Sequence, residues 1–141
     1  MRGKLVYLYA ALRALAAWKH ATFEVTVDGE RHEVTGYSVA VANSKAYGGG
    51  MYLMPHAELD DGKLDIFMKA KEPKLRSLLE LGKVFKGTHL DNPSVTVLKG
   101  ERIHIDADRS FDVYADGDPV AQLPVDIAVE PRALRVIVAA S

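Results

Sequence analysis

Three short stretches of this chain combine residue types that can bind ions, hold phosphate or accept protons. They are the glycine-rich run from Asn43 to Met51, the acidic segment from Pro55 to Leu64, and the turn from Val113 to Pro119. Each contains glycine beside polar or acidic residues, a composition typical of turns that display side chains and backbone groups. Each therefore has both a chemical and a purely architectural interpretation.

The first stretch contains three consecutive glycines, Gly48, Gly49 and Gly50. Glycine costs backbone entropy, so such a run indicates positive φ angles or the close approach of another group. A phosphate cradle is one interpretation. However, phosphate loops lead from a strand into a helix, whereas these glycines lead into another predicted strand. Composition alone therefore favours a bulge or bend.

The second stretch places two adjacent carboxylates, Asp60 and Asp61, directly before Gly62. A turn can point backbone carbonyls inward beside such side chains, and oxygen ligands of this kind suit Mg²⁺ or Ca²⁺. The spacing is not that of an EF-hand loop. A hairpin turn with solvated acidic side chains is the alternative interpretation.

The third stretch carries Asp116, Gly117 and Asp118 on a predicted tight turn. A carboxylate displayed on such a turn could act as a general base. A very similar Asp28-Gly29 pair occurs earlier, and spacing cannot rank the two turns. A plain hairpin remains the default interpretation of both.

The elements that must position these stretches are mostly strands. The alternation of Phe23, Val25 and Val27 begins a series of predicted strands at 23–27, 34–42, 51–54, 64–68, 95–98, 103–105, 111–114, 125–129 and 134–138. Apolar residues at helical spacing predict one helix over about residues 5–15 and a second between Pro73 and Gly87. We expect one domain over residues 1–141, mainly β within the α+β class: an antiparallel β-sandwich-like domain with two helices.

Composition excludes several classes of function. The 141 residues include no cysteine, which excludes thiolate metal sites, disulfides and cysteine nucleophiles. The 18 basic and 19 acidic residues argue against a nucleic-acid partner. No stretch is apolar enough to span a membrane. Arg13 interrupts the apolar run near the start, so an amphipathic helix is favoured over a signal peptide and a cytoplasmic protein is expected.

The net charge of −1 conceals two opposed segments. Residues 69–87 carry a local charge of +4, and residues 100–118 carry a local charge of −4. A basic helix in the first segment could attract an anionic membrane surface, which would place the protein at the inner face of the membrane. A solvated helix face is the alternative.

Taken together, an ordered set of segments resembles the bacterial diacylglycerol kinases, which belong to a wider group with sphingosine and ceramide kinases. The resemblance covers essentially the whole chain, and the segments that carry it are Val39–Asn43, Tyr47–Met51, Pro55, Leu59–Gly62, Asp65, Lys86–His89 and Asp116–Asp118. Such enzymes have an N-terminal α/β domain with a Gly-Gly-Asp-Gly-Thr nucleotide loop, followed by a β-sandwich domain. This chain resembles the second domain and lacks that loop. The resemblance therefore implies an expressed fragment or a natural truncation, without kinase activity of its own.

The resemblance also implies roles for particular residues. The family's structural Mg²⁺ site matches the Asp61 side chain and the backbone carbonyls of Glu58 and Lys63. The family's proposed base lies in an Asp-Gly-Glu turn, which here reads Asp116-Gly117-Asp118. Because the shorter Asp replaces the family's Glu, the choice between Asp116 and Asp118 as base stays open. Asn43 and the Gly48–Gly50 run are further candidate site residues.

The activity implied is ATP-dependent transfer of the γ-phosphoryl group to a lipid hydroxyl such as that of diacylglycerol. Mg²⁺ is the implied cofactor, and ATP would be bound mainly by the absent N-terminal domain. The implied partners are that domain and a lipid substrate at a membrane surface, with no nucleic acid. The oligomeric state stays open, with a homodimer as one candidate. The alternatives are a non-catalytic β-sandwich binding module and a related kinase acting on a soluble substrate.

Overall fold

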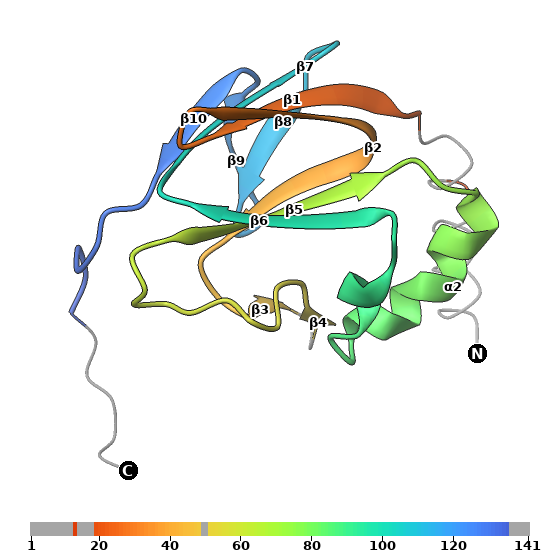
Figure 1. The fold of residues 1–141 in the computed structure, drawn as a ribbon, viewed down its shortest axis with the longest axis horizontal. Helices are drawn as coiled ribbons and strands as arrows, with labels where there is room; N and C mark the ends of the chain where they lie inside the picture. Colours follow the sequence, from red (N-terminus) through yellow and green to blue (C-terminus); the bar gives the residue numbers. More distant parts are fainter. Residues whose placement is uncertain (1–12, 14–18, 49–50, 136–141) are drawn as a thin grey trace.

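Ten strands, one α-helix and one 3-10 helix make up the part of the chain that the computed structural model describes, residues 13, 19–48 and 51–135 (Figure 1). In chain order they are β1 (Ala21–Val27), β2 (Glu30–Ala42), β3 (Ala46–Gly48), β4 (Met51–Tyr52), β5 (Leu64–Ala70), α2 (Lys74–Val84), the 3-10 helix η1 (His89–Asp91), β6 (Val95–Gly100), β7 (Arg102–Ala107), β8 (Asp112–Ala115), β9 (Asp118–Gln122) and β10 (Val125–Ala128). The predicted class, a mainly antiparallel α+β domain, is confirmed.

The main sheet has six antiparallel strands in the order β10-β7-β1-β2-β5-β6. A single residue, Glu101, joins β6 at one edge to β7 beside the other edge. So short a link is compatible with that order only if the sheet curls until β6 comes close to β7. The curl produces the sandwich-like shape (Figure 1), and the pairs β3–β4 and β8–β9 form small sheets of their own.

The main core fills the inside of the curled sheet. The strictly alternating burial of β1 confirms the predicted period of two. Val25 and Ile66 are completely inaccessible to solvent, although their strands are separated by β2. They belong to a cluster contributed by three strands, with members Ala21, Phe23, Val25, Val27, Leu64, Ile66, Met68, Ile103 and Ile105. Burial of these side chains is what holds the sheet in its curled form.

A second, smaller core lies on the opposite face of β5. It consists of Met54, Ala57 and Phe67, with Leu53 and Leu90 packed against them. The loop before β5 and η1 thus cover this face. As a result, β5 is buried from Leu64 to Met68 without interruption. An acidic residue in the middle of that strand, Asp65, is therefore buried as well.

Most predicted elements are present, and the exceptions are two predicted elements and two unpredicted strands. The helix between Pro73 and Gly87 is α2, whereas the helix expected over about residues 5–15 lies outside the described residues apart from Arg13, which is helical. Leu134 and Arg135 are not in a strand, and the rest of the segment 134–138 lies outside the described residues. The strands β3 and β9 were not predicted. β9 contains Pro119, and all five of its residues are exposed, so it has no alternating pattern to detect.

Candidate functional site

The acidic turn before β5 is held by hydrogen bonds to one carboxylate. Asp61 Oδ1 accepts a hydrogen bond from the backbone N–H of Lys63 at 2.9 Å. Asp61 Oδ2 accepts one from the Lys99 ammonium at 2.8 Å. The hydrogen bond from Lys99 and the one from the Lys63 backbone lower the pKa of Asp61, so this carboxyl stays ionised.

Asp65 lies beside this turn and faces Lys99 directly across the β5–β6 ladder. Its Oδ1 is 3.7 Å from the Lys99 Nζ, and its Oδ2 is buried without a hydrogen-bond partner. Burial raises the pKa of Asp65, whereas the hydrogen bond to Asp61 raises that of Lys99. The Lys99 ammonium thus pairs with the carboxylates of both Asp61 and Asp65, and one oxygen of Asp65 has no hydrogen-bond partner.

The oxygen atoms of this turn are of the kind that a hard cation prefers. Asp61 supplies a carboxylate, the predicted Glu58 and Lys63 ligands would supply carbonyls, and Asp65 adds a buried oxygen without a partner. Within the described ranges no group of three or more His, Cys, Asp or Glu side chains could hold a metal ion. A cation bound here would therefore need backbone carbonyls as ligands. It would also lie close to the Lys99 ammonium, which already binds Asp61 Oδ2.

The glycine-rich stretch forms a separate small hairpin. Asn43 is exposed in the bend after β2, and Gly48 ends β3, which pairs with β4. Gly49 and Gly50 lie outside the described residues. Tyr47 and Tyr52 are exposed on the two strands. The glycines thus lead into another strand, as expected, and no helix begins within residues 51–63 to give a phosphate the N-terminus that a phosphate loop requires.

The late turn and its earlier counterpart have the same backbone but different surroundings. Asp28-Gly29 and Asp116-Gly117 both have two consecutive positive φ values, 49° and 91° in the first and 51° and 96° in the second. The Asp28 carboxylate accepts hydrogen bonds from the backbone N–H groups of Glu101 and Arg102. Asp116 and Asp118 are exposed, and in the described part of the chain neither carboxylate has a hydrogen bond or ion pair. The two turns therefore differ in whether the carboxylate is hydrogen-bonded within the described part of the chain.

The candidate residues fall into separate groups. Glu58, Asp61 and Lys63 share the loop before β5, whereas Asp116 and Asp118 belong to the β8–β9 hairpin. Among the described residues, no hydrogen bond or ion pair joins the two groups. Sequence reasoning missed Lys99, which contacts the first group from a strand more than thirty positions later. Its signal would have been the pairing of β5 with β6, which places Lys99 opposite Asp65.

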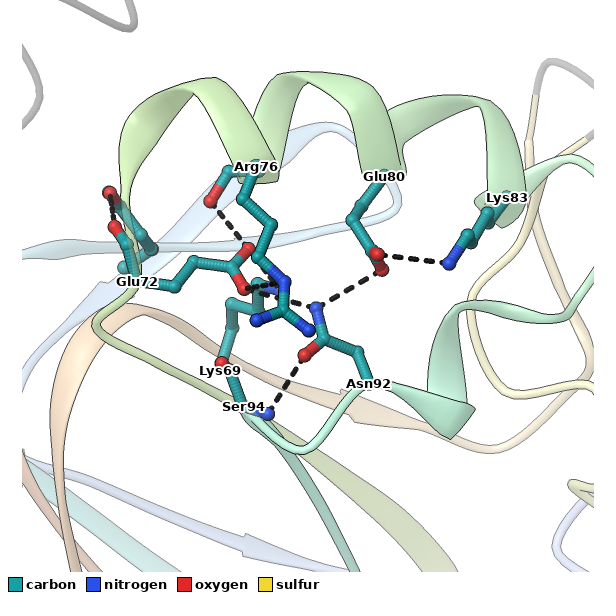
Figure 2. A network of polar contacts seen from close by, with 9 residues as sticks. Lys69, Glu72, Arg76, Glu80, Lys83, Asn92 and Ser94 are labelled. Carbon is teal, nitrogen blue, oxygen red and sulfur yellow. Dashed lines mark hydrogen bonds and ion pairs between the residues drawn. The ribbon is translucent and has the colours of Figure 1, made fainter.

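A second polar cluster that was not predicted anchors α2 to the sheet (Figure 2). The side chain of Glu72 is 2% exposed, and Lys69 Nζ lies 2.6 Å from its Oε1. Ser77 and Asn92 donate further hydrogen bonds to this carboxylate, at 2.7 and 3.1 Å. Burial opposes ionisation, but these hydrogen bonds and the Lys69 charge outweigh it and lower the pKa of Glu72 to about 2.

This cluster shows that some of the basic residues in segment 69–87 are engaged in ion pairs within the chain. Lys69 and Arg76 pair with Glu72, and Lys83 pairs with Glu80, so at least three of the six basic residues have acidic partners. The segment is thus partly an anchoring network and only partly an exposed basic surface. None of the described helices is long and apolar enough to cross a membrane.

Comparison with known proteins gives one consistent result. The chain matches the family described as "YegS C-terminal NAD kinase beta sandwich-like domain" over residues 1–138. It is 32% identical over 136 residues to "Diacylglycerol kinase" of Mycobacterium tuberculosis (strain CDC 1551 / Oshkosh), which covers 96% of this chain and 44% of that protein. It is 29% identical over 133 residues to "Putative lipid kinase YtlR" of Bacillus subtilis (strain 168), covering 94% and 43%.

A solved structure leads to the same group of proteins. The "putative diacylglycerol kinase" from Bacillus anthracis str. Sterne superposes with a TM-score of 0.71 at 25% identity, over 92% of this chain and 45% of that one. The chain therefore spans less than half the length of each of these proteins. The resemblance expected from the ordered motifs is confirmed.

Proposed function

The chain belongs to the family described as the YegS C-terminal NAD kinase beta sandwich-like domain, and from this membership we propose that it is the acceptor-side part of an ATP-dependent lipid kinase. The names of its relatives, which include diacylglycerol kinase, support a lipid alcohol as the substrate class. ATP and its Mg²⁺ would be bound mainly by the additional part that the longer relatives have. Mg²⁺ would there neutralise charge on the transferred phosphoryl group.

In the proposed reaction, the acceptor hydroxyl oxygen forms a bond to the γ-phosphorus while the bond from that phosphorus to the β–γ bridging oxygen of ATP breaks. The hydroxyl proton passes to a carboxylate, and ADP leaves. Phosphoryl transfer of this kind depends mainly on positioning and electrostatics, so the chain must present a carboxylate that is not already engaged. The observation that carries the proposal is the Asp116-Gly117-Asp118 turn, whose carboxylates are exposed and have no hydrogen bond or ion pair to any residue that the structure describes, in contrast to Asp28.

Apolar side chains beside this turn support the proposal. Tyr114 in β8 and Val120 in β9 lie on the two strands that the turn connects, and they are 63% and 61% exposed. Exposed aromatic and aliphatic side chains around a polar group are typical of surfaces that bind a partner or ligand. A lipid that brings its hydroxyl to Asp116 or Asp118 would cover them.

We further propose that α2 faces the membrane that holds this lipid. Leu75 and Leu79 are 69% and 73% exposed and lie four residues apart on one face of the helix. Lys86 is exposed just beyond the helix end, and Lys71 is exposed just before its start. An apolar face flanked by basic residues complements an anionic lipid surface.

The test uses the chain joined to a kinase N-terminal domain of a matched relative. The measurement is ATP-dependent phosphorylation of diacylglycerol in vesicles, with a soluble alcohol in a parallel reaction. We expect turnover of the lipid, and a loss of roughly 10²-fold or more for whichever of Asp116→Asn and Asp118→Asn removes the base. Asp118→Glu should preserve or raise activity if Asp118 is the base.

Three results would contradict the proposal. Undiminished turnover in both Asn variants would exclude the turn as proton acceptor. Preference for the soluble alcohol would favour the related kinase, and absence of any phosphorylation would favour the binding module. The 141-residue chain alone is expected to be inactive.

A further inference from the structure

Lys99 lies where a divalent cation would have to bind. Its Nζ is 2.8 Å from Asp61 Oδ2 and 3.7 Å from Asp65 Oδ1. Asp61 is the only residue expected to contribute its side chain to the Mg²⁺ site that the family resemblance implies. A metal ion that bound Asp61 through Oδ2 would therefore take the place of the ammonium.

The pairing of β5 with β6 fixes the position of Lys99. Strands β5 and β6 pair in a register that sets Asp65 and Lys99 directly opposite each other, and side chains of such a pair are within contact distance. The side chain of Asp65 is 5% exposed and that of Lys99 is 36% exposed. The lysine thus reaches outward from the buried acid toward the turn, where its ammonium meets Asp61.

The electrostatics of the turn require a cation. Two carboxylates this close to one another repel, and burial of one of them increases the cost when no positive charge is near. Lys99 provides one positive charge against two negative ones. It still leaves Asp65 Oδ2 buried without a hydrogen-bond partner, and the three side chains together keep one net negative charge.

We infer that Lys99 is an internal competitor of divalent cations at the Asp61–Asp65 pair and weakens their binding. Removing the ammonium frees Asp61 Oδ2 and leaves both carboxylates without their ion-pair partner, a donor set that favours Mg²⁺. The effect concerns ion binding and does not depend on the kinase chemistry proposed above.

The test measures Mg²⁺ binding to the purified 141-residue chain by isothermal titration calorimetry, with Mn²⁺ as a second probe by its paramagnetic resonance signal. We expect Lys99→Met to bind either ion on the order of tenfold or more tightly than the unaltered chain. Lys45→Met is the control, because it removes one positive charge from an exposed lysine outside the acidic turn. Its affinity should change far less.

Two further variants keep the result interpretable. Lys99→Arg preserves the charge and should bind the ions as weakly as the unaltered chain. Addition of Asp61→Asn to Lys99→Met should abolish the gain, and MgCl₂ should raise the melting temperature of Lys99→Met more than that of the unaltered chain. Equal affinities of Lys99→Met and the unaltered chain, or absence of binding in both, would overturn the inference.

Discussion

Asp28 makes two hydrogen bonds to the backbone of Arg102, one from its own backbone and one to its side chain. The backbone N–H of Asp28 donates to the Arg102 carbonyl at 2.9 Å, and the Asp28 Oδ1 accepts from the Arg102 backbone N–H at 2.8 Å. Arg102 follows Glu101, the single residue that links the two ends of the curled sheet. The carboxylate in the β1–β2 turn therefore fixes the point at which the sheet comes together.

Asp28→Gly should lower the free energy of unfolding more than Asp116→Gly. Glycine adopts the positive φ at both positions, so the comparison isolates the carboxylates. Hydrogen bonds to a charged acceptor contribute about 1.5–3 kcal/mol, and the variant also leaves N–H groups of Glu101 and Arg102 without their acceptor. We expect a difference of about 2 kcal/mol or more by urea denaturation. Equal losses in the two variants would exclude a fastening role for Asp28.

Glu72 should make stability depend on acid pH. Its pKa in the folded chain is about 2, below the ordinary value of 4.5. The stabilisation from ionised Glu72 is therefore complete above pH 4.5 and is lost as the pH falls toward 2.

Glu72→Gln should cost roughly 3 kcal/mol at neutral pH, because a buried ion pair loses one partner. The difference in the free energy of unfolding between the unaltered chain and Glu72→Gln should shrink steadily over this acid range. Glu80→Gln is the control with a smaller effect, because the Glu80 side chain is 14% exposed whereas that of Glu72 is 2% exposed. A difference that stays constant with pH would contradict the role given to Glu72.

Two glycines should respond in opposite ways to alanine. At Gly36, where β2 meets β5, an added Cβ would collide with the Lys69 carbonyl and lie 2.8 Å from the Ala70 Cα. We expect Gly36→Ala to lower the free energy of unfolding by roughly 1–3 kcal/mol. At Gly82 in α2 nothing lies within 4 Å of the added atom, so Gly82→Ala should stabilise the chain by about 0.5–1 kcal/mol. Thermal denaturation should show a lower melting temperature for Gly36→Ala and a higher one for Gly82→Ala than for the unaltered chain.

The exposed leucines of α2 should control binding to lipid vesicles. A leucine that leaves water contributes about 1.5 kcal/mol or more. The double variant Leu75→Ser, Leu79→Ser should therefore bind phosphatidylglycerol-containing vesicles at least roughly tenfold more weakly in a sedimentation assay. Leu134→Ser alters another leucine, 81% exposed and far from α2 in sequence, and should have no effect. Binding that ignores both salt and phosphatidylglycerol content would contradict the proposed membrane face.

The sequence predicted those elements that carry their own periodicity. The alternation in β1 and the helical spacing after Pro73 both correspond to observed elements, because each reflects one buried face. The hairpin strand β9 has no buried face, so no pattern marked it. The curl of the sheet could not be predicted from local sequence patterns either, because it follows from the strand order and the single-residue link at Glu101.

The candidate site was predictable only where its residues are close in sequence. The acidic turn and the Asp116-Gly117-Asp118 turn were both recognised as short stretches. The contact of Asp61 with Lys99 spans 38 positions and arises from strand register, which a single sequence does not reveal. The difference between Asp28 and Asp116 likewise depends on what packs against each turn, although their local sequences are alike.

The position of β1 inside the sheet also has a consequence for synthesis on the ribosome. One neighbour, β2, follows immediately, but the other, β7, begins only at Arg102. Until then β1 presents an open hydrogen-bonding edge and the buried side chains of Ala21, Phe23, Val25 and Val27 without their final cover. Open apolar edges recruit other chains. Nascent chains that stall before β7 should therefore aggregate, whereas those released after β10 should not.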